Sequence, residues 1–167
     1  MIKFKIILIV IYFFLSESLL ANNLAYIDFN FILNNSNIGK NIIKKLDSIN
    51  IRNLDTLKKE QSDLNNEKNE IEKINNIISQ EELNKKIEIY NEKLRKFAKK
   101  QENLSTEFKN TQNSEIDIFI KKINPIIENY MIDNDIDIIL KNENIYISKS
   151  EYNITNKILN LIDKKLK

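Results

Sequence analysis

The 167-residue sequence has no cysteine, histidine or tryptophan, and only one glycine and one proline. Without histidine and cysteine, the chain lacks the usual general base at neutral pH, the thiol nucleophile and most ligands of transition metals. Gly39 stands alone, which excludes the glycine-rich loops that bind nucleotide phosphates. We therefore predict that the protein is not an enzyme, has no catalytic residues, and uses no cofactor or metal.

A strong excess of charge of one sign is also absent. Charged residues make up 30% of the chain, yet the formal net charge is only +2. Both signs are interspersed through the middle of the sequence, which is typical of long solvated helices and not of a nucleic-acid-binding tail. We therefore expect no nucleic-acid partner.

The N-terminus has an apolar run, but a short one. Lys3 and Lys5 precede residues 6–15, and this run is shorter than the roughly 20 residues that a membrane span needs. Ala21 then offers a small residue at a cleavage point. This layout predicts a cleaved signal peptide over residues 1–21 and an exported protein, with an uncleaved anchor as the alternative. A lipoprotein is not expected, because there is no cysteine to acylate.

The apolar segment Leu24–Phe29 predicts a strand within residues 22–36. A long helix is expected over residues 38–77, with Ser36 or Asn34 as its N-cap. Apolar residues there recur at spacings of three, four or seven among polar ones, which indicates a helix with a thin apolar seam. The seam comprises Ile42, Leu46, Ile49, Leu54, Leu57, Leu64, Ile71, Ile74 and Ile78.

A second long helix is expected over residues 80–124, and its seam has a regular heptad pattern. Ser79 and Glu82 have the spacing of a capping box, so this helix begins there and the first ends just before it. Two helices of similar length with a short connection favour an antiparallel hairpin arm over residues 37–124, with its tip near 78–80. One unbroken helix in a parallel coiled coil is the alternative. The second seam comprises Leu83, Ile87, Tyr90, Leu94, Phe97, Gln101, Leu104, Phe108 and Thr111.

The chain changes character after the arm. Pro125 lacks a backbone N–H and is expected to break or kink the helix. Two strands are predicted, Asp135–Leu140 and Ile145–Ser148, followed by an amphipathic helix capped by Asn153 or Thr155. The fold class is therefore mainly α with a small β body, in which a long antiparallel helical hairpin projects from short strands.

The body, residues 22–36 and 125–167, is small for an independent core. Short sheets of this kind rarely stand alone, so pairing with other copies of the chain is the economical solution. Such assemblies usually have closed cyclic symmetry. Several hairpins projecting from one closed body would enclose a space, which suggests a container or clamp for other molecules.

The ends of the chain resemble the Skp/OmpH family of periplasmic chaperones for outer-membrane proteins. The order of these motifs covers the whole chain after the predicted signal peptide. The resemblance implies a jellyfish-like homotrimer whose arms hold unfolded outer-membrane proteins without ATP. One departure is that the family is often strongly basic, whereas this chain is nearly neutral. The similar segments are Leu24–Asn30, Asn35–Lys40, Ile123–Ile127, Asp135–Leu140, Ile145–Tyr146, and Tyr152–Thr155 with Ile158–Leu159.

Two sets of residues are candidates for interaction. A run without acidic residues, together with two seam aromatics, is the candidate surface for clients, meaning the unfolded proteins to be held. A solvated helix face and ordinary seam packing are the alternatives for these two groups. The client candidates are Lys93, Arg95, Lys96, Lys99, Lys100, Tyr90 and Phe97. The candidates for a shared oligomer core are Ile27, Ile138, Leu140 and Tyr146.

These observations favour an ATP-independent periplasmic holdase that prevents aggregation of unfolded outer-membrane proteins. Contact with a membrane surface is a further expectation. The alternative is a structural coiled-coil adaptor or spacer of the bacterial envelope. A holdase binds several unrelated unfolded proteins, whereas an adaptor binds one folded partner.

Overall fold

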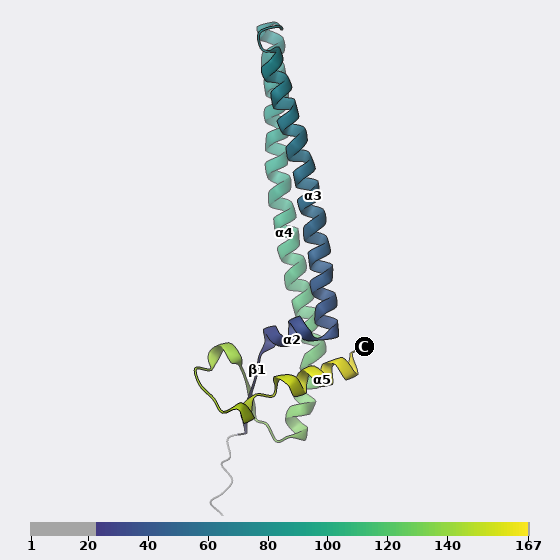
Figure 1. The fold of residues 1–167 in the computed structure, drawn as a ribbon, viewed down its shortest axis with the longest axis vertical. Coiled ribbons are helices and arrows are strands. Elements are labelled where there is room, and N and C mark those ends of the chain that lie inside the picture. Colours follow the sequence, from purple (N-terminus) through teal and green to yellow (C-terminus); the bar gives the residue numbers. More distant parts are fainter. Residues whose placement is uncertain (1–22, 167) are drawn as a thin grey trace, which may run out of the picture.

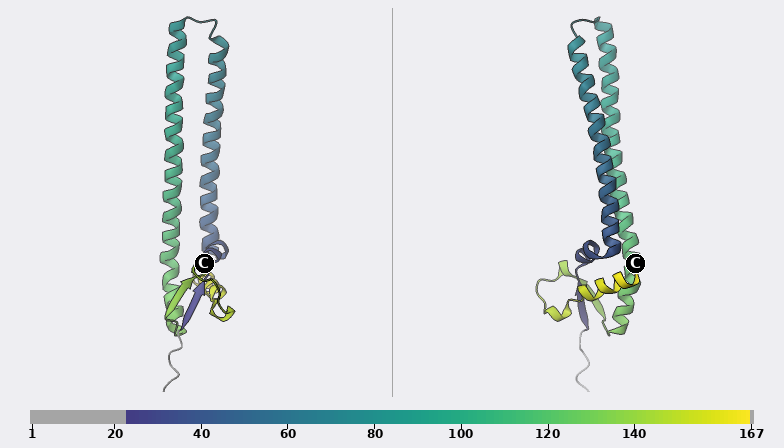
Figure 2. Two further views of the ribbon diagram at one scale, coloured as in Figure 1. Left: turned by 90° about the vertical axis from the view of Figure 1, so that its left-hand side faces the viewer. Right: turned by 45° about the vertical axis from the view of Figure 1, so that its right-hand side comes forward.

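The computed structural model describes residues 23–166, and within them a long helical arm rises from a small body (Figure 1). The arm is a hairpin of two antiparallel helices, which run side by side from the body to the tip (Figure 2). This architecture confirms the predicted fold class. The predicted signal peptide lies outside the described residues. No helix among residues 23–166 is long and apolar enough to cross a membrane.

The arm is formed by α3 (Asn37–Ile74) and α4 (Gln80–Asp133). The 38 residues of α3 correspond to a length of about 57 Å at 1.5 Å per residue. Ser36 is the N-cap of α3, and its hydroxyl accepts a hydrogen bond from the Gly39 N–H at 3.1 Å. The predicted Ser36 cap is therefore confirmed, while the other candidate, Asn34, lies within the preceding helix.

The tip confirms the capping box. The Ser79 hydroxyl accepts from the Glu82 N–H at 3.3 Å, and a Glu82 carboxylate oxygen accepts from the Ser79 N–H at 3.2 Å. These two bonds satisfy backbone donors that would otherwise lack partners at the start of α4. A short turn after α3 then brings the chain back, so the alternative of one unbroken helix is wrong.

The body contains a two-stranded parallel sheet of β1 (Leu24–Ile27) and β2 (Ile138–Lys141). Leu24 lies opposite Ile138 in the register, so strands separated by the entire arm pair directly. Two short helices pack on this sheet, α2 (Phe29–Asn35) and α5 (Thr155–Lys165). The pairing of distant strands closes the body at the base of the arm.

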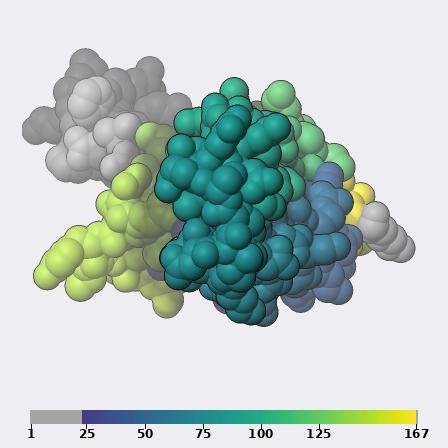
Figure 3. All heavy atoms as spheres, turned by 90° about the horizontal axis from the view of Figure 1, so that it is seen from above, coloured from purple at the N-terminus to yellow at the C-terminus, as the bar shows by residue number. Residues whose placement is uncertain are grey.

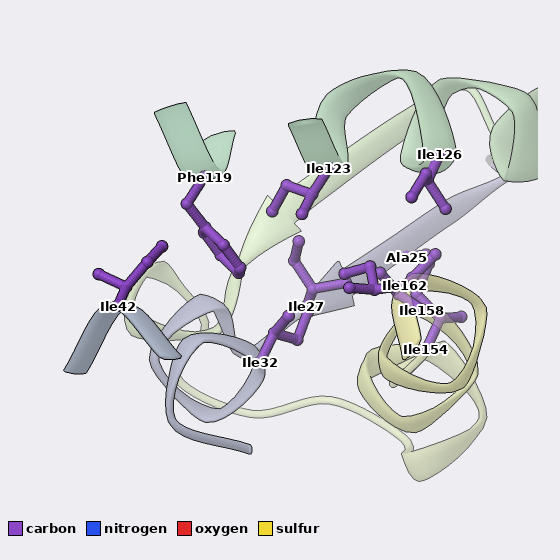
Figure 4. Packing of buried hydrophobic residues seen from close by; sticks show 10 residues of the cluster. All are labelled: Ala25, Ile27, Ile32, Ile42, Phe119, Ile123, Ile126, Ile154, Ile158 and Ile162. Carbon is purple, nitrogen blue, oxygen red and sulfur yellow. The ribbon is translucent and has the colours of Figure 1, made fainter. Parts of the chain in front are cut away.

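One apolar core joins all these elements of the body (Figure 4). Phe119 and Ile32 are completely buried, and the rings of Phe119 and Phe29 meet edge to face with centroids 5.7 Å apart. Aromatic pairs of this geometry contribute about 0.5–1.5 kcal/mol beyond burial. The buried members are Ala25, Ile27, Ile32, Ile42, Phe119, Ile123, Ile126, Ile154, Ile158 and Ile162.

Hydrogen bonds from the C-terminal segment hold the N-terminal segment in place. The Thr155 hydroxyl accepts from the Asp28 N–H at 2.9 Å, and an Asp163 carboxylate oxygen accepts from the Asn37 N–H at 2.7 Å. Neither predicted cap of α5 is its N-cap, which is Ile154 and makes no side-chain capping bond. Asn153 accepts from the Thr155 N–H at 3.0 Å, and the Thr155 hydroxyl accepts from the Asp28 N–H instead. The two ends of the described chain are thus joined within one body.

Pro125 does not end α4, so the predicted helix end at residue 124 was wrong: the helix continues to Asp133. A proline inside a helix costs about 3 kcal/mol. Its neighbours Ile123 and Ile126 are 1% and 5% exposed, and burying each isoleucine is worth about 1.5–3 kcal/mol. Tertiary packing therefore offsets the loss of one helical hydrogen bond.

Two strand predictions also need correction. Phe29 lies in α2 and not in the first strand, because the Asp28 carboxylate accepts from the Phe31 N–H at 2.8 Å and starts a helix there. Residues 145–148 were predicted as a strand but form an irregular loop between two short 3-10 helices, Asn142–Asn144 and Ser150–Tyr152. Seen along the arm, the loop region projects sideways from the body (Figure 3).

Candidate interaction surfaces of the arm and body

Three ion pairs bridge the two helices of the arm. Along α3, the three partners follow one another at intervals of 15 and 7 residues. Along α4, their partners follow at the same intervals in the opposite direction, so the antiparallel register is constant over this stretch. We call the side of the hairpin that carries these pairs the ion-paired side. The pairs are Lys45–Glu115 at 2.6 Å, Glu60–Lys100 at 2.7 Å and Glu67–Lys93 at 2.7 Å.

The predicted basic run is divided by these pairs. Lys93 and Lys100 each meet a glutamate of α3, so part of their charge is neutralised within the hairpin. Arg95, Lys96 and Lys99 are exposed and have no carboxylate within 4.0 Å among residues 23–166. Of the five cations in the predicted run, these three form a basic set without ion pairs among residues 23–166.

These ion pairs were not predicted, although the sequence contains a signal for them. Glu60 and Glu67 are seven residues apart, as are Lys93 and Lys100, so each pair of like charges recurs on one flank of its helix. Their alignment across the hairpin depends on the length of the tip turn.

The seam aromatics are half-buried. Tyr90, Phe97 and Phe108 each keep part of the side-chain surface in water. Between residues 43 and 118, Leu64 is the most buried residue, at 4% exposure. Leu54 and Ile87 were predicted as seam residues but are 57% and 40% exposed, so the prediction was wrong at these two positions. The apolar seam of the arm is therefore thin.

A hollow of about 160 Å³ lies near the tip. Glu67, which forms an ion pair with Lys93, is one of its lining residues. Three of its six lining side chains are charged and the other three are isoleucines. It is lined by Glu67, Glu70, Ile71, Ile74, Lys86 and Ile89.

The body has an incomplete sheet. The outer edge of β1 is partly covered by a bridge between Tyr26 and Asn153, while β2 has no second strand partner among residues 23–166. Two hollows of about 350 and 270 Å³ lie beside the sheet, and both have mainly apolar linings. An open strand edge with apolar surroundings is a typical place for pairing with another chain.

The four predicted oligomerisation residues differ in exposure. Ile138 and Leu140 of β2 are 51% and 41% exposed, and Tyr146 in the loop is fully exposed. Ile27 is 7% exposed and packs in the core of its own chain, which leaves it little surface to share. Ile147, which was not singled out from the sequence, is 85% exposed beside Tyr146.

Among residues 23–166, no group of three or more acidic side chains is placed to hold a metal ion. The exposed features are instead an arm with a charged side, a basic set without ion pairs, and an open apolar edge on the body. The fold that presents these features is a long helical hairpin arm on a small body.

Comparison with known proteins identifies the family. Residues 23–162 match the family Outer membrane protein (OmpH-like), and the chain belongs to this family. A crystal structure from Caulobacter crescentus CB15, of a protein assigned as an OmpH-like outer membrane chaperone, has the same fold. Its TM-score is 0.78 at 16% sequence identity, with 90% of this chain and 89% of that chain covered. No curated protein sequence matches.

Proposed function

We propose that the protein is an ATP-independent holdase chaperone of the periplasm that encloses unfolded outer-membrane proteins between helical arms. The observation that carries the proposal is the arm itself. Roughly 57 Å of α3 packs on α4 and is otherwise open to solvent above the body (Figure 2). A hairpin with this much free surface is built to contact something outside its own chain.

The open body supports assembly into a homotrimer. Edge strand β2 exposes Ile138 and Leu140, and the loop presents Tyr146 and Ile147 next to an apolar hollow. Burying such side chains is worth about 1.5–3 kcal/mol each. Closed symmetry would place three arms around one space. Sedimentation equilibrium should find trimers at micromolar concentration, and a monomer would contradict this arrangement.

Clients are held by many weak contacts along the arms and not by one deep pocket. Enclosure raises the effective concentration of each contact, so avidity exceeds single-contact affinity by about 10²–10⁴. The exposed set Arg95, Lys96 and Lys99 adds a long-range attraction that salt screens over about 8 Å at physiological ionic strength. Tyr90 and Phe97 add the part of their rings that the seam leaves in water.

The test is suppression of aggregation. Several unrelated outer-membrane β-barrel proteins are diluted from urea with and without the mature protein, and light scattering is followed without ATP. We expect suppression for all of them. Binding to a single folded envelope protein, without suppression, would instead identify a structural adaptor. N-terminal sequencing of the exported protein should begin near Asn22 if the signal peptide is cleaved.

A further inference from the structure

The interior of the arm changes character at one level. Between residues 43 and 118, nearly all side chains that are not exposed are apolar or aromatic, or belong to one of the three ion pairs that bridge the hairpin. The exceptions are Asn53, Thr56 and Thr111. All three lie in one short stretch of the hairpin, so the apolar contact between the two helices is interrupted there.

The register of the ion pairs places this stretch. Glu60 lies level with Lys100. One heptad nearer the body, the same register puts Asn53 level with Glu107. The two threonines lie within about one helical turn of this level. We call the stretch the polar level of the arm, and it comprises residues 49–57 of α3 and residues 103–111 of α4.

The polar level also lacks a bridging ion pair. The pairs at Glu60 and Glu67 are seven residues apart, whereas the next pair toward the body, at Lys45, is fifteen residues from Glu60. Fifteen residues of helix span about 22 Å. Among residues 23–166, no ion pair bridges the two helices within that span. A pair at the regular interval would need a cation at position 53 to meet Glu107, and Asn53 is uncharged.

The two threonines of the polar level bond to their own helices. The Thr56 hydroxyl donates to the Arg52 carbonyl at 2.8 Å. The Thr111 hydroxyl donates to the Glu107 carbonyl at 2.8 Å, which lies at nearly the same level on the other helix. Bonds of this type often bend a helix slightly. They favour bending of both helices at one level, and neither bond joins the helices to each other.

We infer that the polar level is a hinge of the arm, at which the two helices separate locally and the tip half bends relative to the body. Both α3 and α4 continue through this level without interruption, so the bend is elastic and reversible (Figure 2). Bending costs the contacts that are lost between the helices. It therefore concentrates where polar side chains interrupt the seam and no ion pair bridges it. The apolar side chains that remain half-buried there are Ile49, Leu57, Leu104 and Phe108.

The use of the hinge rests on the proposed holdase function. Arms that bend at mid-length can close on a small client and open for a large one, while the body at their base stays unchanged. The distributed weak contacts along the arm then form with clients of different size. Without bending, a client would contact only the part of the arm that happens to match its width.

The first experiment measures amide hydrogen exchange along the mature protein by mass spectrometry. Fraying from the tip would make exchange fall steadily from the tip to the body. A hinge instead predicts a local maximum of exchange over residues 49–57 and 103–111, with slower exchange on both sides. A steady fall would overturn the hinge.

Two substitutions at one position test the cause. Asn53→Lys supplies the missing partner of Glu107, and Asn53→Leu restores the apolar seam. We expect each to slow exchange at the polar level by about two- to fivefold. Asn65→Lys is the matched control, because it adds the same charge at an exposed position of α3 with no acidic residue three or four positions away. Equal exchange in the control and in both Asn53 variants would show that position 53 does not set the flexibility.

The second experiment locks the hinge. The sequence has no cysteine, so introduced pairs can be joined selectively by a short, reducible thiol crosslinker. Asn53→Cys with Glu107→Cys bridges the polar level, whereas Glu67→Cys with Lys93→Cys bridges the hairpin nearer the tip as a control. The probe is an unfolded outer-membrane barrel protein. We expect the first lock to slow its capture several-fold, with recovery on reduction, and the second to have no effect.

The outcomes separate the two proposals. If the wild type fails to suppress aggregation, the holdase function is wrong, while the exchange profile still decides whether the hinge exists. If the wild type suppresses aggregation but exchange has no maximum at the polar level, the hinge is wrong. If both locks slow capture equally, or neither does, the hinge has no part in capture.

Discussion

Substitution of Gly39 by alanine should destabilise the junction between α2 and α3. A Cβ at this position would lie 1.9 Å from the Leu33 carbonyl oxygen and 2.8 Å from the Ser36 hydroxyl oxygen. Carbon–oxygen contacts ordinarily begin at about 3.3 Å, so the two backbones would have to separate by about 1.4 Å. The nearest atom belongs to backbone and cannot rotate away.

Two opposing terms determine the magnitude. Alanine in place of glycine inside a helix is favourable by about 1 kcal/mol. Overpacking against rigid surroundings costs about 1–3 kcal/mol, and more where the backbone is involved. We expect Gly39→Ala to lower the free energy of unfolding by about 1–2 kcal/mol, since the short contact outweighs the helix propensity. For a chain of this size each kcal/mol lowers Tm by about 2–4 °C.

The assay is thermal unfolding followed by circular dichroism at fixed protein concentration. Asn66→Ala is the control, because it improves helix propensity at an exposed position of α3 without a short contact. The control should leave Tm unchanged or slightly higher. An increase of Tm in Gly39→Ala would refute the close approach of α2 to the start of α3.

Three further substitutions test other local features. Asp135 has φ of 52° in the left-handed region after α4, so Asp135→Gly should raise the free energy of unfolding, measured by urea titration, by about 0.5–1 kcal/mol. An unchanged or lower free energy of unfolding would argue against this backbone conformation. In a double-mutant cycle, Glu60→Lys and Lys100→Glu should each lower the free energy of unfolding, and the double variant should recover about 0.2–1 kcal/mol of it. A coupling energy of zero would mean that the pair does not form in solution. Ser79→Ala should remove about 1 kcal/mol of capping at the tip and speed amide exchange in the first turn of α4, with the rest of the arm unaffected.

The features that the sequence predicted correctly depend on neighbours along the chain. Ser79 and Glu82 are three residues apart, so their capping box forms within one helical turn. The Ser36 cap rests on an equally short spacing, from Ser36 to Gly39. Such interactions depend little on the rest of the fold, which is why the hairpin and its tip could be predicted.

The candidate surfaces were only partly predictable. The basic run was visible in the sequence, but its division into ion-paired Lys93 and Lys100 and the three other cations depends on α3 lying alongside.

Tertiary structure alone decided the body. Pro125 stays within α4 because Ile123 and Ile126 are buried against elements distant in sequence. The pairing of Leu24 with Ile138 joins residues on either side of the whole arm, and no local pattern encodes that register. By itself, then, the sequence determined the two long helices of the hairpin, the Ser36 cap and the capping box at Ser79, because those depend on short-range spacing. The path through Pro125, the parallel sheet and the irregular loop at 145–148 were decided by burial between distant segments, which offsets local preferences.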